Sequence, residues 1–239
     1  MVDLQASLTD LVAYTKARYG VDQVGIIGHS WGSALGATYV LDHPDDVAFY
    51  VGIGQVVTPV EDEAVALSQT RELATSLGRQ DLLDQLSEIS TDYPNPDNFL
   101  TLAYEAAILR SVQRELGFGT ADFVQYLPLL LTNQVDKLSA SDQEMLDRML
   151  LNQRLYRELL ATDIYAMDLE FSMPFYLISG ENDIQVPRSQ SEKMIERVQA
   201  PTKEMMIIPD AGHTPMIDQE TDFIQTLTTI INRTFSANG

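Results

Sequence analysis

Short apolar runs alternate with amphipathic stretches at both ends of the chain. Runs of strand length predict four β-strands, over residues 24–28, 47–53, 174–179 and 204–208. The first run is apolar on both faces, as expected of a strand inside a parallel sheet that helices cover. Helices are predicted between and beside these strands, over residues 3–19, 31–41, 189–198 and 218–235. This alternation indicates an α/β fold with a parallel, doubly wound sheet of about four strands.

The first predicted helix is amphipathic. Its apolar side chains recur at spacings near four and three, and they are Leu4, Leu8, Leu11, Val12 and Tyr19. Gly20 is placed to cap the C-terminal end of this helix. The second predicted helix is instead rich in glycine, serine and alanine, and small residues let a helix lie close to a sheet.

The middle of the chain is different in kind, because it predicts one helix after another. The expected helices cover residues 63–77, 81–89, 98–116 and 142–160, and a capping-box spacing from Ser141 to Glu144 supports the start of the last one. A structureless linker of this length would be unusual, so we interpret the segment as an inserted helical cap over a site. The predicted organisation is a first core part over residues 1–57, a cap over 58–168 and a second core part over 169–239.

Composition narrows the class of protein. The chain has 239 residues, of which 45% are hydrophobic, enough for one sizeable core. Its apolar runs are too short to cross a bilayer, and its start lacks the pattern of a signal peptide, so a cytoplasmic location is expected. With no cysteine, disulfides and thiolate metal sites are excluded, and the three scattered histidines argue against a zinc site. No cofactor is expected.

The charge balance restricts the partners. Fifteen basic residues stand against 35 acidic ones, a formal net charge of −20. Such a protein repels phosphates, which argues against nucleic acid or an anionic membrane surface as partner. A neutral or cationic small molecule or short peptide is compatible with this charge. The other interpretation is an acidic surface that only keeps the protein soluble.

The sequence G-H-S-W-G at residues 28–32 matches the G-x-S-x-G motif. It stands between a predicted strand and a predicted helix, where a nucleophile elbow belongs. The turn is sharp, so we expect the flanking Gly28 and Gly32 to be required as glycines. The alternative is a chance match in an ordinary turn, but the strand and helix on either side argue against it. Ser30 is therefore the candidate nucleophile.

A serine nucleophile needs a base and an acid that orients the base. Asp183 follows the third predicted strand and His213 follows the fourth, which gives the chain order Ser, Asp, His. Because the carboxyl ends of parallel strands meet at one edge of a sheet, the three side chains are expected to gather there. Glu181 remains a weaker candidate for the acid. Asp210 is interpreted as a turn residue that shapes the loop before His213.

The two other histidines have structural interpretations. His29 occupies the variable position of the elbow and is expected to pack beneath it. His43, in the sequence Asp-His-Pro, is expected to end a helix.

These motifs resemble the α/β-hydrolase superfamily, and within it the proline iminopeptidase branch. The resemblance rests on Gly28 to Ser33 with Gly36, Gly52 to Val57, Gly180 to Asp183 with Pro187, and Gly212–His213 with Pro215. It covers residues 1–57 and 170–239 well, and the cap only by size and position. It is highly specific for the superfamily and less so for a peptidase over an esterase.

The resemblance implies roles for further residues. The backbone N–H of Trp31 would be one donor of the oxyanion hole. In the similar peptidases, cap acids hold the free N-terminal ammonium of the substrate. Conceivable counterparts, none of which matches a motif, are Glu61, Asp62, Glu63 and Glu105. A run of acids at 61–63 is also typical of an exposed helix start.

The resemblance also implies strands before the first predicted helix, and nothing in this sequence corresponds to them. The loop that supplies a second oxyanion N–H would lie among those strands. The strand over 24–28 would then have one bare edge, and a bare apolar edge favours association. We expect either that the chain is a fragment of a longer protein or that a second copy covers this edge as a homodimer.

Together these features predict a serine hydrolase that acts through an acyl-enzyme, with a small peptide or amide carrying a free N-terminus as the substrate. A carboxylic-ester hydrolase with the same triad is the alternative. A third interpretation, from another class, is a truncated and catalytically impaired hydrolase that serves as a binding or assembly module.

Overall fold

The computed structural model describes residues 2–117, 154–155 and 157–236 of the chain. Four parallel strands form one sheet, as predicted, and their order in the sheet is β1-β2-β3-β4. Their bounds are β1 Val24–His29, β2 Val47–Ile53, β3 Phe175–Gly180 and β4 Lys203–Ile208. Glycine residues Gly28 and Gly52 pair across β1 and β2, and Gly180 pairs with Ile208 across β3 and β4.

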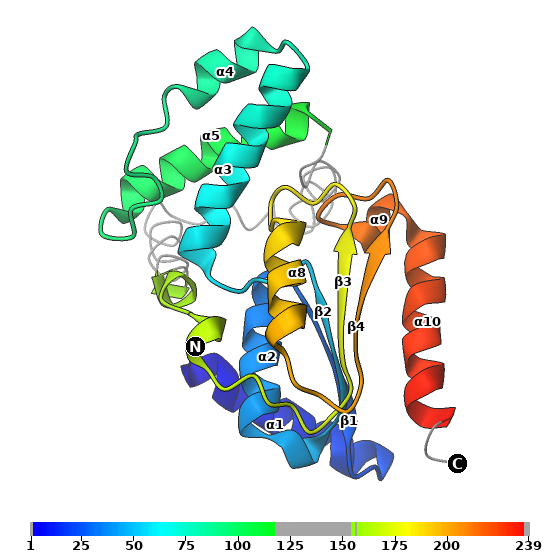
Figure 1. The fold of residues 1–239 in the computed structure, drawn as a ribbon. Helices are drawn as coiled ribbons and strands as arrows, with labels where there is room; N and C mark the ends of the chain where they lie inside the picture. Colours follow the sequence, from blue (N-terminus) through cyan, green and yellow to red (C-terminus); the bar gives the residue numbers. More distant parts are fainter. Residues whose placement is uncertain (1, 118–153, 156, 237–239) are drawn as a thin grey trace, which may run out of the picture.

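Helices cover the sheet in layers (Figure 1). One face packs against α1 Val2–Tyr19, α2 Trp31–Asp42 and α8 Arg188–Arg197, and its buried side chains include Val40, Tyr50, Phe175, Leu177 and Met194. On the other face, α10 Glu220–Ser236 buries Phe223 and Ile230 against β-strand residues. Layers on both faces explain why β2 and β3 are buried along almost their whole length.

The helix predicted over residues 218–235 corresponds to α10, and a short helix that was not predicted precedes it. This short helix, α9 Pro215–Asp218, begins with Pro215 in the first turn, and α10 follows after Gln219. Proline is favoured at such a start because its missing N–H would be unpaired there anyway.

Two predictions about the β1 side of the molecule are wrong. In α1, Val12 is buried and Leu8 packs beside it, but Leu11 is 59% and Tyr19 70% exposed. The strand β1 is also not covered on both faces, because Ile27 is 46% exposed. Among the described residues β1 pairs only with β2, and α10 contacts β4 at the opposite edge of the sheet. The first strand therefore lies at an edge, with less cover than its apolar sequence suggests.

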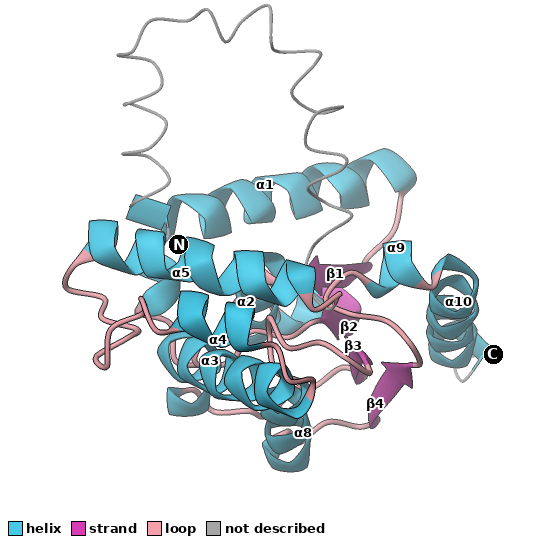
Figure 2. Cartoon of the chain, turned by 90° about the horizontal axis from the view of Figure 1, so that it is seen from above, coloured by secondary structure: helices cyan, strands magenta, loops and turns pink. Residues whose placement is uncertain are grey.

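The described part of the predicted cap includes a 3-10 helix at Ile164–Ala166 and helical residues within 154–160. Its other helices are α3 Pro59–Ser76, α4 Gln80–Leu86 and α5 Phe99–Glu115. These three form one group. They lie beyond the carboxyl ends of the strands and share a separate hydrophobic core (Figures 1 and 2), which includes Leu67, Leu82, Leu86, Leu102 and Leu109. The helix α3 begins four residues before its predicted start, with Pro59 in its first turn. The predicted capping box at 141–144 and most of the helix over 142–160 lie outside the described residues. No helix in the described ranges is both long and apolar enough to span a membrane.

Candidate active site

Ser30 stands at the tip of the turn between β1 and α2. Its φ is 53° and its ψ −124°, a strained conformation for a non-glycine residue. A Cβ on Gly28 would lie 2.4 Å from the carbonyl oxygen of Gly32, so the turn closes only with glycine at position 28. Gly32 is different, since a Cβ there would meet no described atom within 4 Å. Of the two glycines expected to be required, only Gly28 is fixed by contacts within the described structure.

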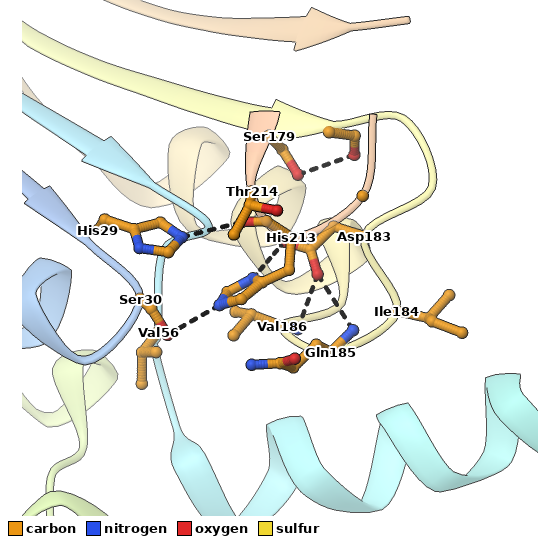
Figure 3. A network of polar contacts seen from close by, with 12 residues as sticks. His29, Ser30, Val56, Ser179, Asp183, Ile184, Gln185, Val186, His213 and Thr214 are labelled. Atoms are coloured by element: carbon orange, nitrogen blue, oxygen red, sulfur yellow. Dashed lines mark hydrogen bonds and ion pairs between the residues drawn. The ribbon is translucent and has the colours of Figure 1, made fainter. Parts of the chain in front are cut away.

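The three predicted side chains come together at the carboxyl ends of β1, β3 and β4 (Figure 3). His213 Nδ1 lies 2.9 Å from Asp183 Oδ2, and His213 Nε2 lies 2.8 Å from Ser30 Oγ. A carboxylate only accepts, so Nδ1 carries the proton and Nε2 is left to accept from the serine hydroxyl. Asp183 is 3% and His213 1% exposed, which keeps this pair away from water.

Backbone amides fix the orientation of Asp183. Its Oδ1 accepts hydrogen bonds from the N–H groups of Val186, at 2.9 Å, and Gln185, at 3.1 Å (Figure 3). With Oδ1 occupied in this way, Oδ2 faces His213. The loop after β3 thus holds the carboxylate by one oxygen and presents the other to the base.

The neighbouring acids are used differently. Glu181 Oε2 accepts a hydrogen bond from Asp210 N at 3.2 Å, and the residue is exposed. Asp210 has a φ of 55°, in the left-handed region that turns favour, as expected for the residue that shapes this loop. Asp183, and not Glu181, contacts the imidazole.

A close approach of two loops brings His213 to Asp183. A Cβ on Gly180 would lie 2.0 Å from the carbonyl oxygen of Gly212, so only glycine at the end of β3 allows this approach. Gly212 N in turn donates to Asp218 Oδ2 at 2.9 Å, which ties the loop of the base to α9. These local contacts set the position of the imidazole before any substrate arrives.

His29 lies beside the base. Its Nε2 donates to the carbonyl oxygen of His213 at 2.8 Å, and the two rings are 4.8 Å apart (Figure 3). Burial, together with the neighbouring His213, lowers the pKa of His29 from its ordinary value of 6.5. A neutral ring here supports the loop without placing a second positive charge next to an imidazolium. His43, as predicted, ends α2, where its ring stacks on Tyr39.

Gly54, one residue beyond β2, is part of the site although no sequence motif assigned it a role there. Its φ is 52°, and a Cβ on it would lie 2.9 Å from His213 Cε1 and 3.2 Å from Asp183 Oδ2. The absence of a side chain thus makes room for the base and the acid. A glycine directly after a strand was the available signal, but only the fold reveals which residues it faces.

Trp31 is the first residue of α2, where helix N–H groups lack partners within the helix. Its side chain packs against Ala34, Val56, Leu159 and Val186. Its assignment as an oxyanion donor remains a prediction.

Two of the four cap acids considered above lie at the base of the cap. Glu61 is exposed and lies 3.6 Å from Lys193 Nζ. Asp62 is buried, and its carboxylate accepts from the backbone N–H groups of Val57 and Thr58 and from the side chain of Gln190. Burial raises the pKa of Asp62 to about 7, outweighing these three hydrogen bonds. Asp62 thus joins α3 to the core.

The other two lie inside the cap. Glu63 forms an ion pair with Arg110 and accepts a hydrogen bond from Tyr93. Glu105 is 3% exposed and accepts from Ser90 N at 2.8 Å. The described contacts of these two acids are to other cap residues, and a role of the cap acids in holding a substrate ammonium stays a prediction. Among the described residues no group of three or more His, Asp or Glu could share a metal ion.

Solved structures with the same fold cover nearly the whole chain. One is the α/β-hydrolase enzyme MGS-MChE2 from a sediment metagenome of the Mar Chica lagoon, with a TM-score of 0.52 and 14% identity over 96% of this chain and 70% of that one. Another is the esterase EaEST from Exiguobacterium antarcticum, with a TM-score of 0.53 and 14% identity over 95% and 74%. At this identity the likeness shows the fold alone.

A sequence relative and a family match go further. The chain is 25% identical over 216 residues to a protein described as probable aminopeptidase YbaC, from Bacillus subtilis strain 168. That alignment covers 88% of this chain but only 66% of the relative. The sequence model of the family described as "alpha/beta hydrolase fold" matches residues 3–220. The parallel sheet, the elbow after β1 and this match lead to one conclusion: the chain belongs to the α/β-hydrolase family.

Proposed function

We propose that the protein is a serine hydrolase that acts through an acyl-enzyme, with Ser30 as nucleophile, His213 as base and Asp183 as the acid that orients the base. The observation that carries this proposal is the continuous hydrogen-bond chain from Ser30 Oγ through the imidazole to Asp183. The same constellation of roles recurs in hydrolases of unrelated folds, so it is recognised by geometry.

The reaction follows from the positions of the protons. Ser30 Oγ attacks the substrate carbonyl carbon while His213 Nε2 takes the hydroxyl proton, and Asp183 stabilises the resulting imidazolium. The imidazolium then gives the proton to the leaving amine or alcohol, and an ester of Ser30 remains. Water, activated by the same imidazole, hydrolyses this ester and restores the serine.

The negative oxygen of the tetrahedral intermediate needs donors. Trp31 N is the donor that we assign, at the N-terminus of α2. Removal of one donor from such a hole typically lowers the rate by about 10²–10³-fold. We expect a second N–H donor to complete the oxyanion hole.

For the substrate we favour a small peptide or amide with a free N-terminus. The support is the sequence relative described as a probable aminopeptidase, together with the net charge of −20, which suits a cationic substrate. The likeness to solved esterases is too distant in sequence to favour an ester.

The first test is labelling with a fluorophosphonate probe, which reacts with activated serines. We expect the native protein to be labelled and Ser30→Ala to lose labelling, with hydrolysis reduced about 10⁴-fold or more. Ser68→Ala, at an exposed serine of α3, is the matched control and should label normally. Absence of labelling in the native protein would contradict the proposal and favour the non-catalytic interpretation.

The second test separates the substrate classes. Aminoacyl amides, their N-acetylated forms and short-chain esters are compared as substrates of the native protein. A peptidase that requires a free N-terminus hydrolyses the aminoacyl amides and loses activity on the acetylated forms. Faster hydrolysis of the esters, with no effect of acetylation, would reject the aminopeptidase assignment and leave the triad intact.

A further inference from the structure

One side chain of the cap reaches the loop that carries the acid. Gln113, on α5, is fully buried, and its Nε2 donates to the carbonyl oxygen of Ile184 at 2.8 Å. Ile184 directly follows Asp183 in the loop after β3 (Figure 3). This contact joins residues that are 71 positions apart in the sequence.

The peptide group that Gln113 binds is the one that orients the acid. The carbonyl of Ile184 and the N–H of Gln185 belong to the same planar peptide unit. Its carbonyl accepts from Gln113, while its N–H donates to Asp183 Oδ1 at 3.1 Å. A hydrogen bond to the carbonyl both fixes the plane of the peptide and polarises its N–H. Gln113 therefore acts on the carboxylate through a single rigid group.

Both the oxygen and the nitrogen of the Gln113 amide form hydrogen bonds. Its Oε1 accepts from Arg110 at 3.0 Å, and its Nε2 also donates to Thr70 Oγ1 at 3.1 Å. Arg110 in turn pairs with Glu63 of α3. Arginine only donates and a carbonyl oxygen only accepts, so these partners fix which end of the amide is oxygen and which is nitrogen. Polar contacts thus run from α3 through α5 to the acid loop.

We propose that Gln113 is a positioning residue through which the cap sets the orientation of Asp183, and with it the hydrogen bond to His213. This inference rests on the proposed function of the triad. The inference gives the cap a second role besides covering the substrate, because the position of α5 then affects the hydrogen bond between Asp183 and His213. A displacement of α5 of about 1 Å would lengthen the bond to Ile184 beyond the normal hydrogen-bond range.

The test compares two buried variants of the cap. Gln113→Met keeps the length of the side chain and removes both N–H donors. Thr70→Val, the matched control, removes the other acceptor of the Gln113 Nε2 group and leaves the bond to Ile184 in place. We expect Gln113→Met to lower kcat about tenfold with KM within about twofold of the native value, and Thr70→Val to leave both nearly unchanged. The acidic limb of the pH–rate profile of Gln113→Met should also move to lower pH, because the imidazolium loses part of its stabilisation.

A spectroscopic readout works even without turnover. The proton between His213 Nδ1 and Asp183 should give a downfield resonance in the proton NMR spectrum, shifted or broadened in Gln113→Met and unchanged in Thr70→Val. An unchanged resonance in folded Gln113→Met, or equal changes in both variants, would overturn the inference. If Gln113→Met alone changes the resonance but the native protein does not react with fluorophosphonate, the inference stands and the proposed function fails.

Discussion

Gly54 illustrates at the scale of one residue how the site depends on an absent side chain. Its left-handed backbone brings the chain under the imidazole, and a methyl group there would press against both His213 and Asp183. Removing this glycine disturbs the geometry of the triad without removing any of its reacting groups.

We expect Gly54→Ala to lower kcat roughly 10- to 100-fold, because a small displacement of the base has a large effect on rate. Gly78→Ala is the matched control, since Gly78 has a similar φ of 65° and open space around it. Both variants should lose about 1 kcal/mol of stability from the strained backbone. Enzyme assays and thermal unfolding of the two proteins check this. Equal activity in the two variants would show that the contact with His213 has no effect.

At the scale of elements, a buried carboxyl group contributes to the attachment of α3 to the core. Asp62 accepts hydrogen bonds from Val57, in the segment after β2, and from Gln190 of α8. It therefore connects the first turn of α3 both to the end of a strand and to a helix that packs on the sheet. Its pKa of about 7 exceeds the ordinary value of 3.8, so the folded chain keeps this proton where the unfolded chain has released it.

The sign of the pH dependence follows. Between about pH 4 and pH 7 the folded state binds more protons at Asp62, so the stability contributed by this group falls as the pH rises. Asp62→Asn cannot titrate, so its free energy of unfolding should fall less than that of the native protein as the pH rises through this window. The gap between the two falls should widen by at most about 1.4 kcal/mol per pH unit. Urea unfolding at pH 5, 6 and 8 measures it. Glu61→Gln, its exposed neighbour, should keep the pH dependence of the native protein, and the same curve from Asp62→Asn would contradict the assignment.

At the scale of the whole molecule, the β1 edge of the sheet is the part that neighbouring elements cover least among the described residues. Exposed apolar side chains lie on both elements. Ile27 is on the face of β1 that points away from α1, and Leu11, Tyr14 and Tyr19 are on α1 itself. Within the described ranges, nothing pairs with the outer edge of β1. The net charge of −20 opposes self-association, and salt screens this repulsion.

Of the two explanations given for this edge in the sequence analysis, the homodimer predicts a mass by light scattering of twice the 26.7 kDa chain and a larger share of dimer at high salt. Ile27→Lys should shift the mass towards that of one chain, because a lysine on an edge strand opposes pairing. Ile207→Lys, at a 37% exposed position on the opposite edge strand β4, is the control and should leave the dimer intact. A monomer at all salt concentrations would reject the dimer.

Much of the fold could be predicted from the sequence, because the pattern of apolar and polar residues within a short segment indicates whether it forms a strand or a helix. Apolar runs of strand length located all four strands, and the helices between them imposed a parallel sheet. The chemistry of the candidate site was equally local, since Ser30, Asp183 and His213 each lie in the turn or loop that follows a strand. A parallel sheet then brings such positions to one edge.

What the sequence alone determined is therefore the position of each strand along the chain and the chemistry at the strand ends, because both follow from short-range patterns. Only the tertiary structure decided which surfaces are buried and which distant residues meet. The periodicity of α1 could not reveal that Leu11 and Tyr19 lack a partner, since cover depends on neighbouring elements. Nor could any local pattern reveal that Gly54 faces His213, or that Gln113 binds the loop of the acid, because these contacts join segments far apart in the chain.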